Sequence, residues 1–315
     1  MSLAFLFPGQ GSQAVGMGQD LAEAFASARE VFQEVDDALG QHLFRLMREG
    51  PEDQLTLTEN AQPALMAVSV AVMRALEREF GVGVDKAAFV AGHSLGEYSA
   101  LAAAGALGLG ETARLLKLRG QAMQRAVPVG AGAMASLIGP KTDVALAEQA
   151  AAAGAEFGVC VVANDNNAGN VVISGDKAAV DKAIEKAKEL GARAIPLNVS
   201  APFHCPLMQP AADEMAQALA GAAIVAPRAP VVANVTARPV HDPEEIRRLL
   251  VEQVTGRVRW RESVQWMAGE GGGVTRFAEA GAGKVLSGMV KRLAPEAEAL
   301  PLNAPADLEA FARTV

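Results

Sequence analysis

The chain has 315 residues, of which 50% are hydrophobic and 20% are charged, and its formal net charge is −8. This length is enough for a large hydrophobic core and about one or two domains. The acidic balance, with lysine and arginine scattered along the chain, excludes the concentrated basic surface typical of nucleic-acid-binding proteins.

The first part of the chain alternates between apolar runs of strand length and segments with helical periodicity. A strand is predicted at 3–7, helices at 18–39 and 61–80, and a second strand at 87–91 that leads directly into another helix. This alternation is typical of an α/β fold.

The next part of the chain has a different order of elements. The predicted elements are a strand at 132–138, a helix at 141–153, strands at 159–163 and 170–174, a helix at 177–190 and a strand at 193–199. This βαββαβ order is typical of a ferredoxin-like module, and the polar segment 164–169 is the expected turn between the two central strands. We therefore expect a small domain at 130–199, inserted into a large domain formed by 1–129 and 200–315.

The last part of the chain returns to the α/β pattern, with a helix from Pro206, a strand at 230–233 and a strand, loop and helix at 275–292. The two cysteines of the chain are too few for a disulfide framework and indicate a reducing compartment, so we expect a cytoplasmic protein. No Cys/His cluster has metal-ligand spacing, and the first eight residues lack a basic leader. We therefore expect no metal, no signal peptide and no membrane span.

The segment 92–96, Gly-His-Ser-Leu-Gly, lies where the strand at 87–91 gives way to a helix. A Gly-x-Ser-x-Gly turn in this setting exposes a serine hydroxyl, and the amino end of the following helix favours an oxyanion nearby. Ser94 is therefore the candidate nucleophile. The alternative for the bare motif is an ordinary turn between a strand and a helix.

A nucleophilic serine needs a base, and the chain has four histidines. We expect His42 on a helix surface, His241 before a helix whose first residues are Asp-Pro-Glu-Glu, and His93 facing away from its neighbour in the turn. His204 lies between two prolines where the chain re-enters the large domain, which makes it the candidate general base. The alternatives are that His204 is a buried structural histidine and that the adjacent Cys205 is a thiol nucleophile.

Arg119 falls at the centre of the apolar face of its predicted helix when successive residues are placed about 100° apart. A guanidinium that points into the protein is costly unless an anion pairs with it. Its partner is therefore either an internal carboxylate or the carboxylate of a bound ligand, which the planar guanidinium can hold through two parallel hydrogen bonds.

Five motifs in order along the chain carry a family resemblance that extends over nearly its whole length. The motifs are Phe-Pro-Gly-Gln-Gly-Ser-Gln at 7–13, Gln-Pro-Ala-Leu at 62–65, Gly-His-Ser-Leu-Gly-Glu-Tyr at 92–98, Arg-Gly at 119–120 and Phe-His at 203–204. Together they resemble those of malonyl-CoA:acyl carrier protein transacylases. The resemblance implies an α/β-hydrolase-like large domain with an inserted ferredoxin-like domain.

The resemblance also implies roles for individual residues. It makes Ser94 the acylated nucleophile and His204 its base, and it places the malonyl carboxylate on Arg119. The other implied roles are backbone amides of Gln10 and Leu95 in the oxyanion hole, a backbone carbonyl of Gln253 that orients the histidine, Phe203 at the acyl group, where its bulk disfavours a methylmalonyl branch, and carrier docking at Arg193. Lys182 and Lys186, on the helix before Arg193, are near it in sequence and are further docking candidates, the alternative being ordinary solvated lysines. Asp165 and Asp176 remain alternative triad acids, although turn and cap roles fit them better.

The implied reaction moves a malonyl group from malonyl-CoA through a Ser94 acyl-enzyme to the phosphopantetheine thiol of an acyl carrier protein. It belongs to fatty acid or polyketide biosynthesis, needs no bound cofactor, and takes the coenzyme A thioester as substrate. We expect a monomer. One rival interpretation is a serine esterase or thioesterase that uses water as acceptor, and another is a non-enzymatic module that binds the carrier.

Overall fold

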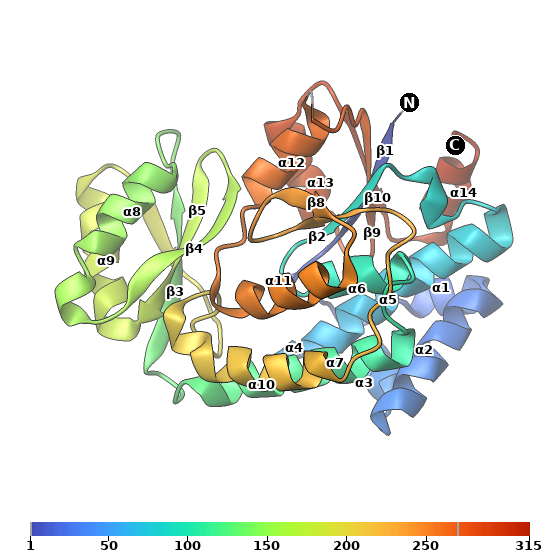
Figure 1. Ribbon diagram of the computed structural model, residues 1–315, viewed down its shortest axis with the longest axis horizontal. Helices are drawn as coiled ribbons and strands as arrows, with labels where there is room; N and C mark the ends of the chain where they lie inside the picture. Colours follow the sequence, from blue (N-terminus) through green and yellow to red (C-terminus); the bar gives the residue numbers. More distant parts are fainter. Residues whose placement is uncertain (1, 270) are drawn as a thin grey trace.

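The computed structural model describes residues 2–269 and 271–315, which fold around two β-sheets (Figure 1). The larger sheet has six strands in the order β10-β9-β1-β2-β7-β8, and all neighbouring pairs are parallel except β7 and β8. The strands are β1 (Leu3–Phe7), β2 (Phe89–Gly92), β7 (Val231–Ala233), β8 (Arg238–Val240), β9 (Arg276–Ala280) and β10 (Glu298–Leu302). The protein therefore has an α/β fold with a mixed large sheet.

Both faces of the large sheet are covered, as the wholly buried strand β1 requires. Its residues Leu3, Phe5 and Phe7 belong to one hydrophobic core, and Ala4 and Leu6 belong to the core on the opposite face. The first core includes side chains of α1 (Gln19–Ala24), α2 (Ala26–Leu39), α3 (Leu43–Glu49), α5 (Thr58–Phe80), α6 (Gly96–Ala103), α7 (Leu109–Ala126), α10 (Gln209–Ala220), α11 (Pro243–Thr255) and α14 (Pro305–Ala312), and the second those of α12 (Trp260–Ala268) and α13 (Val285–Leu293). Among the described residues, no helix has the length and apolar character needed to cross a membrane.

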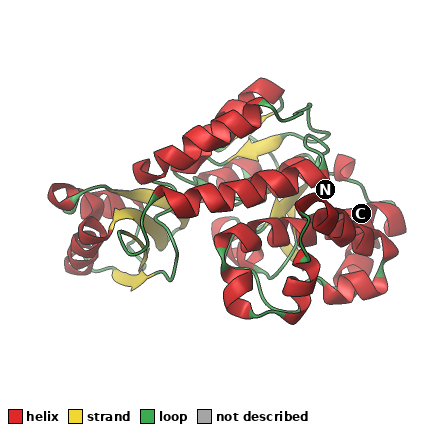
Figure 2. Cartoon of the chain, turned by 90° about the horizontal axis from the view of Figure 1, so that it is seen from below, coloured by secondary structure: helices red, strands yellow, loops and turns green. Residues whose placement is uncertain are grey.

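The smaller sheet lies beside the large one and forms a separate lobe, seen on the left in both Figure 1 and Figure 2. Its antiparallel strands have the order β4-β5-β3-β6. The elements along the chain are β3 (Gly132–Ile138), α8 (Val144–Ala152), β4 (Cys160–Asn167), β5 (Asn170–Asp176), α9 (Lys177–Glu189) and β6 (Arg193–Pro196). These elements occur in the predicted order, and the two helices share a core with the sheet.

Several predicted boundaries were wrong. The helix expected at 18–39 breaks at Phe25, and the strand expected at 193–199 ends at Pro196. The segment 164–169 is not a turn, because β4 continues to Asn167 and only residues 168–169 connect it to β5. The short elements α4 (Glu52–Thr56), η1 (Val84–Lys86), η2 (Ala155–Phe157) and η3 (Pro206–Met208) complete the chain.

Candidate active site

Ser94 lies in a tight turn between β2 and α6, and its backbone has a φ of +53°. Few residues other than glycine adopt this left-handed conformation. The flanking glycines are required by packing, since a Cβ at Gly92 would overlap the carbonyl group of Gly96 and a Cβ at Gly96 would overlap the carbonyl oxygen of Phe7. The turn expected from the sequence is therefore present, with the serine at its bend.

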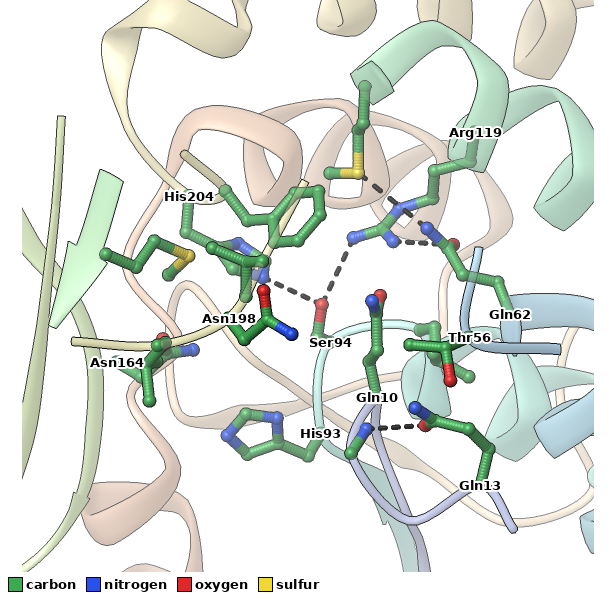
Figure 3. Close-up of a pocket in the computed structure, with 17 residues that line it drawn as sticks. Gln10, Gln13, Thr56, Gln62, His93, Ser94, Arg119, Asn164, Asn198 and His204 are labelled. Carbon is green, nitrogen blue, oxygen red and sulfur yellow. Dashed lines mark hydrogen bonds between the residues drawn. The ribbon is translucent and has the colours of Figure 1, made fainter. Parts of the chain in front are cut away.

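His204 lies within hydrogen-bond distance of the serine, with its Nε2 2.7 Å from Ser94 Oγ (Figure 3). Its Nδ1 lies 2.9 Å from the backbone carbonyl oxygen of Gln253, which can only accept a hydrogen bond. Nδ1 therefore carries the proton of the neutral ring, and Nε2 is free to accept one. Burial, helped by the positive charge of Arg119, lowers the pKa of His204 to about 3 and keeps the ring neutral.

Arg119 projects from α7 to the other side of the serine, and its residue is only 1% exposed (Figure 3). One terminal nitrogen donates to Gln62 Oε1 at 2.8 Å, and the other donates to Gln253 Oε1 at 2.8 Å and lies 3.3 Å from Ser94 Oγ. Within residues 2–269 and 271–315, no carboxylate lies within ion-pairing distance of this guanidinium, and its Nε has no partner. Burial lowers the pKa of Arg119, whereas Tyr98 and Glu97 oppose that effect. Neutral oxygens thus hold a buried cation whose charge is not paired.

A cavity of about 300 Å³ opens at these three side chains. Its lining also includes Gln10, Leu95 and Phe203. None of the hydrogen bonds in the described parts of the chain uses the backbone amide of Gln10 or Leu95, so both amides remain able to donate. Gln10 itself is anchored through its side chain, whose Nε2 donates to Thr58 Oγ1 at 3.3 Å. A neutral base, a hydroxyl and a buried cation therefore meet in one cavity, which is an arrangement suited to acyl transfer from an anionic substrate.

Residues 4–291 match the model of the acyl transferase domain family. The chain belongs to this family. It is 44% identical over 308 residues to the malonyl CoA-acyl carrier protein transacylase of Escherichia coli (strain K12), covering 98% of this chain and 97% of the relative. It is 43% identical over 314 residues to the protein of the same name from Bacillus subtilis (strain 168), covering 99% of this chain and 97% of that relative.

Solved structures of malonyltransferases also superpose on this acyl transferase over its whole length. The acyl-carrier-protein-S-malonyltransferase of Bartonella henselae superposes with a TM-score of 0.96 at 53% identity, over 100% of this chain and 99% of that one. A malonyl-transacylase in complex with a type II PKS acyl-carrier protein, PlMCAT:AntF, superposes with a TM-score of 0.95 at 42% identity, over the whole of both chains.

In the part of the chain that the structure describes, the alternative acids and the alternative nucleophile of this acyl transferase bond to other groups and not to the His204 ring. Asp165, buried in β4 rather than in a turn, pairs with Arg261 at 2.8 Å. Asp176 stands before α9 but does not cap it, because its carboxylate accepts from the backbone amide of Val159 at 2.7 Å. The thiol of Cys205 donates a hydrogen bond to the carbonyl oxygen of Pro202, and burial raises the pKa of this thiol. A backbone carbonyl, rather than a carboxylate, therefore contacts the histidine.

The other three histidines take no part in the Ser94 contact. His93 lines the cavity, but its Nε2 lies 2.9 Å from Asn166 Oδ1, and burial lowers its pKa. His42 is exposed and precedes α3 instead of lying within a helix. His241 is also exposed and precedes α11, where the Asp242 side chain accepts from the backbone amide of Glu245, as the sequence predicted.

Sequence reasoning assigned no role to two polar residues that surround the serine. Asn234 accepts from the Ser94 amide through Oδ1 at 2.8 Å and donates to the Gly92 carbonyl oxygen through Nδ2 at 2.7 Å. Glu97 accepts from the backbone amide of Asn234 at 3.0 Å, and burial raises its pKa to about 7 despite this bond and one from Gln253. A signal existed for both, since Asn234 directly follows a predicted strand and Glu97 is the one charged residue of α6.

The candidate docking residues lie on the small lobe, away from the cavity lining. On α9, Lys182 pairs with Glu185 at 2.8 Å and Lys186 pairs with Glu189 at 2.9 Å. Arg193, at the start of β6, is exposed. The structure does not bring these three side chains to the serine.

Proposed function

We propose that this acyl transferase moves a malonyl group from malonyl-CoA to the phosphopantetheine thiol of an acyl carrier protein, in fatty acid or polyketide biosynthesis. The observation that carries the proposal is the buried, unpaired guanidinium of Arg119, 3.3 Å from Ser94 Oγ. A buried charge of this kind costs free energy unless an anion pairs with it directly, and the free carboxylate of a malonyl group attached to the serine would be such a partner. An acetyl group has no such carboxylate.

In the first half of the reaction, Ser94 Oγ attacks the thioester carbonyl while its proton passes to Nε2 of His204. The carbonyl of Gln253 accepts from Nδ1–H and stabilises the imidazolium that forms. The backbone amides of Gln10 and Leu95 donate to the oxyanion, in agreement with their place in the cavity wall. When the carbon–sulfur bond breaks, the proton on His204 moves to the departing thiolate, and coenzyme A leaves as a thiol.

In the second half, the thiol of the carrier's phosphopantetheine arm takes the place of coenzyme A. His204 accepts its proton, the sulfur attacks the malonyl ester, and the bond to Ser94 Oγ breaks as the proton returns to that oxygen. Coenzyme A enters only as the thioester substrate, and the proposed steps use no bound cofactor. Phe203 lines the cavity, and its bulk would disfavour a methylmalonyl branch.

We also infer the finer architecture expected from the sequence. Residues 1–129 and 200–315 would form an α/β-hydrolase-like domain, and residues 130–199 an inserted ferredoxin-like domain. The parallel strands covered on both faces support the first assignment, and the strand order β4-β5-β3-β6 with its two crossover helices supports the second. The cavity then lies between the domains, since Met134 and Asn164 of the small lobe line it together with Ser94.

An acidic carrier requires a basic contact area on this chain of net charge −8, and exposed Arg193 supports a docking role for the small lobe. Lys182 and Lys186 would contribute to the same area once released from their glutamate partners. We further propose that the protein acts as a monomer in the cytoplasm, a reducing compartment that suits its two free cysteines.

A transfer assay separates this function from its alternative, a serine esterase or thioesterase. The protein is incubated with malonyl-CoA, with and without a phosphopantetheinylated carrier, and malonyl-carrier and free malonate are both quantified. We expect rapid formation of malonyl-carrier, slow release of malonate, and neither product with Ser94→Ala. Malonate release at the same rate with and without the carrier would instead establish a hydrolase.

A further inference from the structure

The side-chain amide of Gln253 has a fixed orientation between three partners. Its Nε2 donates to Glu97 Oε2 at 2.8 Å and to the backbone carbonyl oxygen of Ser94 at 3.0 Å, while its Oε1 accepts from Arg119 at 2.8 Å. Reversing the amide would place its oxygen against two acceptors and its NH₂ group against a guanidinium donor. Only one orientation satisfies all three partners, and it is the one that presents an oxygen to Arg119.

Glu97 connects the Gln253 amide to Asn234, the residue whose side chain binds the backbone of Ser94. The carboxylate stands on the first turn of α6, and its residue is 3% exposed. The same Oε2 that accepts from Gln253 also accepts from the backbone amide of Asn234, whose side chain binds the Ser94 amide. One buried carboxylate thus supports the neighbours of both the serine and the arginine.

The position of Glu97 also explains why Arg119 keeps an unpaired charge. A carboxylate in direct contact with the guanidinium would neutralise it and compete with any anionic ligand. Gln253 separates the two charges, so Arg119 is held by neutral amide oxygens from Gln62 and Gln253. Amide oxygens fix the guanidinium in space without occupying it with a counter-charge.

We propose that Glu97 is a positioning residue for substrate selection, whose carboxylate holds the Gln253 amide in the orientation that fixes Arg119 for the carboxylate of the acyl group. This inference rests on the proposed function, because it concerns the choice of acyl group in the same cavity. Glu97 itself does not touch the reacting atoms, and it acts through Gln253.

The test compares two variants at the same position. Glu97→Met keeps most of the side-chain volume but removes the acceptor, whereas the matched control Glu97→Gln keeps an oxygen that can accept from Gln253. For each, kcat/KM is measured with malonyl-CoA and with acetyl-CoA at pH 8, and Tm and circular dichroism report the fold. The assay pH lies above the pKa of Glu97, which burial raises to about 7, so that its ionised form predominates.

We expect Glu97→Met to lower the ratio of kcat/KM for malonyl-CoA to that for acetyl-CoA by about 10-fold or more, because Arg119 loses its fixed position. We expect Glu97→Gln to keep this ratio within about threefold of wild type, a threshold well below that 10-fold loss. A ratio that stays unchanged in Glu97→Met, with both substrates slowed equally, would show a merely structural role. A ratio that rises would show that Glu97 acts as a counter-charge, and would also overturn the proposal.

Gln253→Met tests the same contact from the other side and serves if Glu97→Met does not fold. It keeps the backbone carbonyl that binds His204 but removes the amide, and we expect the same loss of malonyl preference. In the double variant the two losses should not add, because they act through one contact, and fully additive losses would contradict the proposal. Wild-type protein that transfers no malonyl group would disprove the proposed function instead, so the two failures are distinguishable.

Discussion

Removing the guanidinium of Arg119 should abolish the preference for a malonyl group without abolishing the chemistry of Ser94. In Arg119→Ala, the serine keeps its 2.7 Å contact with His204, and the turn keeps its bonds to Asn234. What is lost is a buried cation that no carboxylate of the described chain neutralises. A malonyl group attached to Ser94 would therefore be buried with an unpaired carboxylate.

The size of the effect follows from this burial. Breaking a buried ion pair by removing one partner costs about 3–5 kcal/mol, and each 1.4 kcal/mol is about a factor of ten. We therefore expect kcat/KM for malonyl-CoA to fall by at least about 100-fold in Arg119→Ala. The value for acetyl-CoA should stay the same or rise, because acetyl makes no use of the guanidinium.

The assay measures acyl-enzyme formation in single turnover with both thioesters. Arg119→Lys is the matched control, since it keeps the charge but loses the planar fork, and we expect an intermediate preference. Urea denaturation of each variant reports its fold. An unchanged ratio of malonyl to acetyl rates in a folded Arg119→Ala protein would refute the role given to this residue.

Three further outcomes are expected. Asn234→Asp puts a carboxylate oxygen against the Gly92 carbonyl, so single-turnover acylation should slow by about 10-fold or more and the free energy of unfolding should fall by about 1–3 kcal/mol; an unchanged acylation rate would contradict this. Gly120→Ala places a Cβ 2.6 Å from the Glu59 Cα, so the unfolding free energy in urea should fall by about 1–3 kcal/mol, and a gain would count against this packing. The folded protein holds the pKa of His204 near 3, below its unfolded value of 6.5, so the unfolded chain binds the extra proton between these two pH values. The free energy of unfolding therefore decreases as pH falls from 6.5 toward 3. His204→Gln should reduce the slope of stability against pH in this range by about one proton, and identical slopes would exclude the shift.

The parts of the fold that the sequence predicted are those with strong local signals. The wholly apolar run at 3–7 and the turn at 92–96 were both found at the right place. The polar run at 164–167 was misassigned as a turn because its burial depends on the large lobe, where Asp165 meets Arg261. No local pattern reports a partner 96 residues away.

In the candidate site, too, local patterns predicted some features, and others depend on residues far apart in the sequence. Helical periodicity predicted that Arg119 is buried, and the structure agrees. Periodicity could not choose between an internal carboxylate and a ligand, because that choice depends on Gln62 and Gln253, which lie 57 and 134 residues away in sequence. The roles of Asn234 and Glu97 were missed for the same reason, since both depend on strands β2 and β7 being neighbours in the sheet.

The central claim is that Ser94 carries the malonyl group between two thiols, and trapping that ester tests it most directly. The protein is mixed briefly with malonyl-CoA, and a phosphopantetheinylated carrier is then added to half of the sample. Both halves are quenched in acid, digested and analysed by mass spectrometry. We expect one malonyl group on the peptide that contains Ser94, lost on addition of the carrier and recovered on the carrier's phosphopantetheine arm. An adduct on any other residue, or an adduct on Ser94 that the carrier does not remove, would contradict the account.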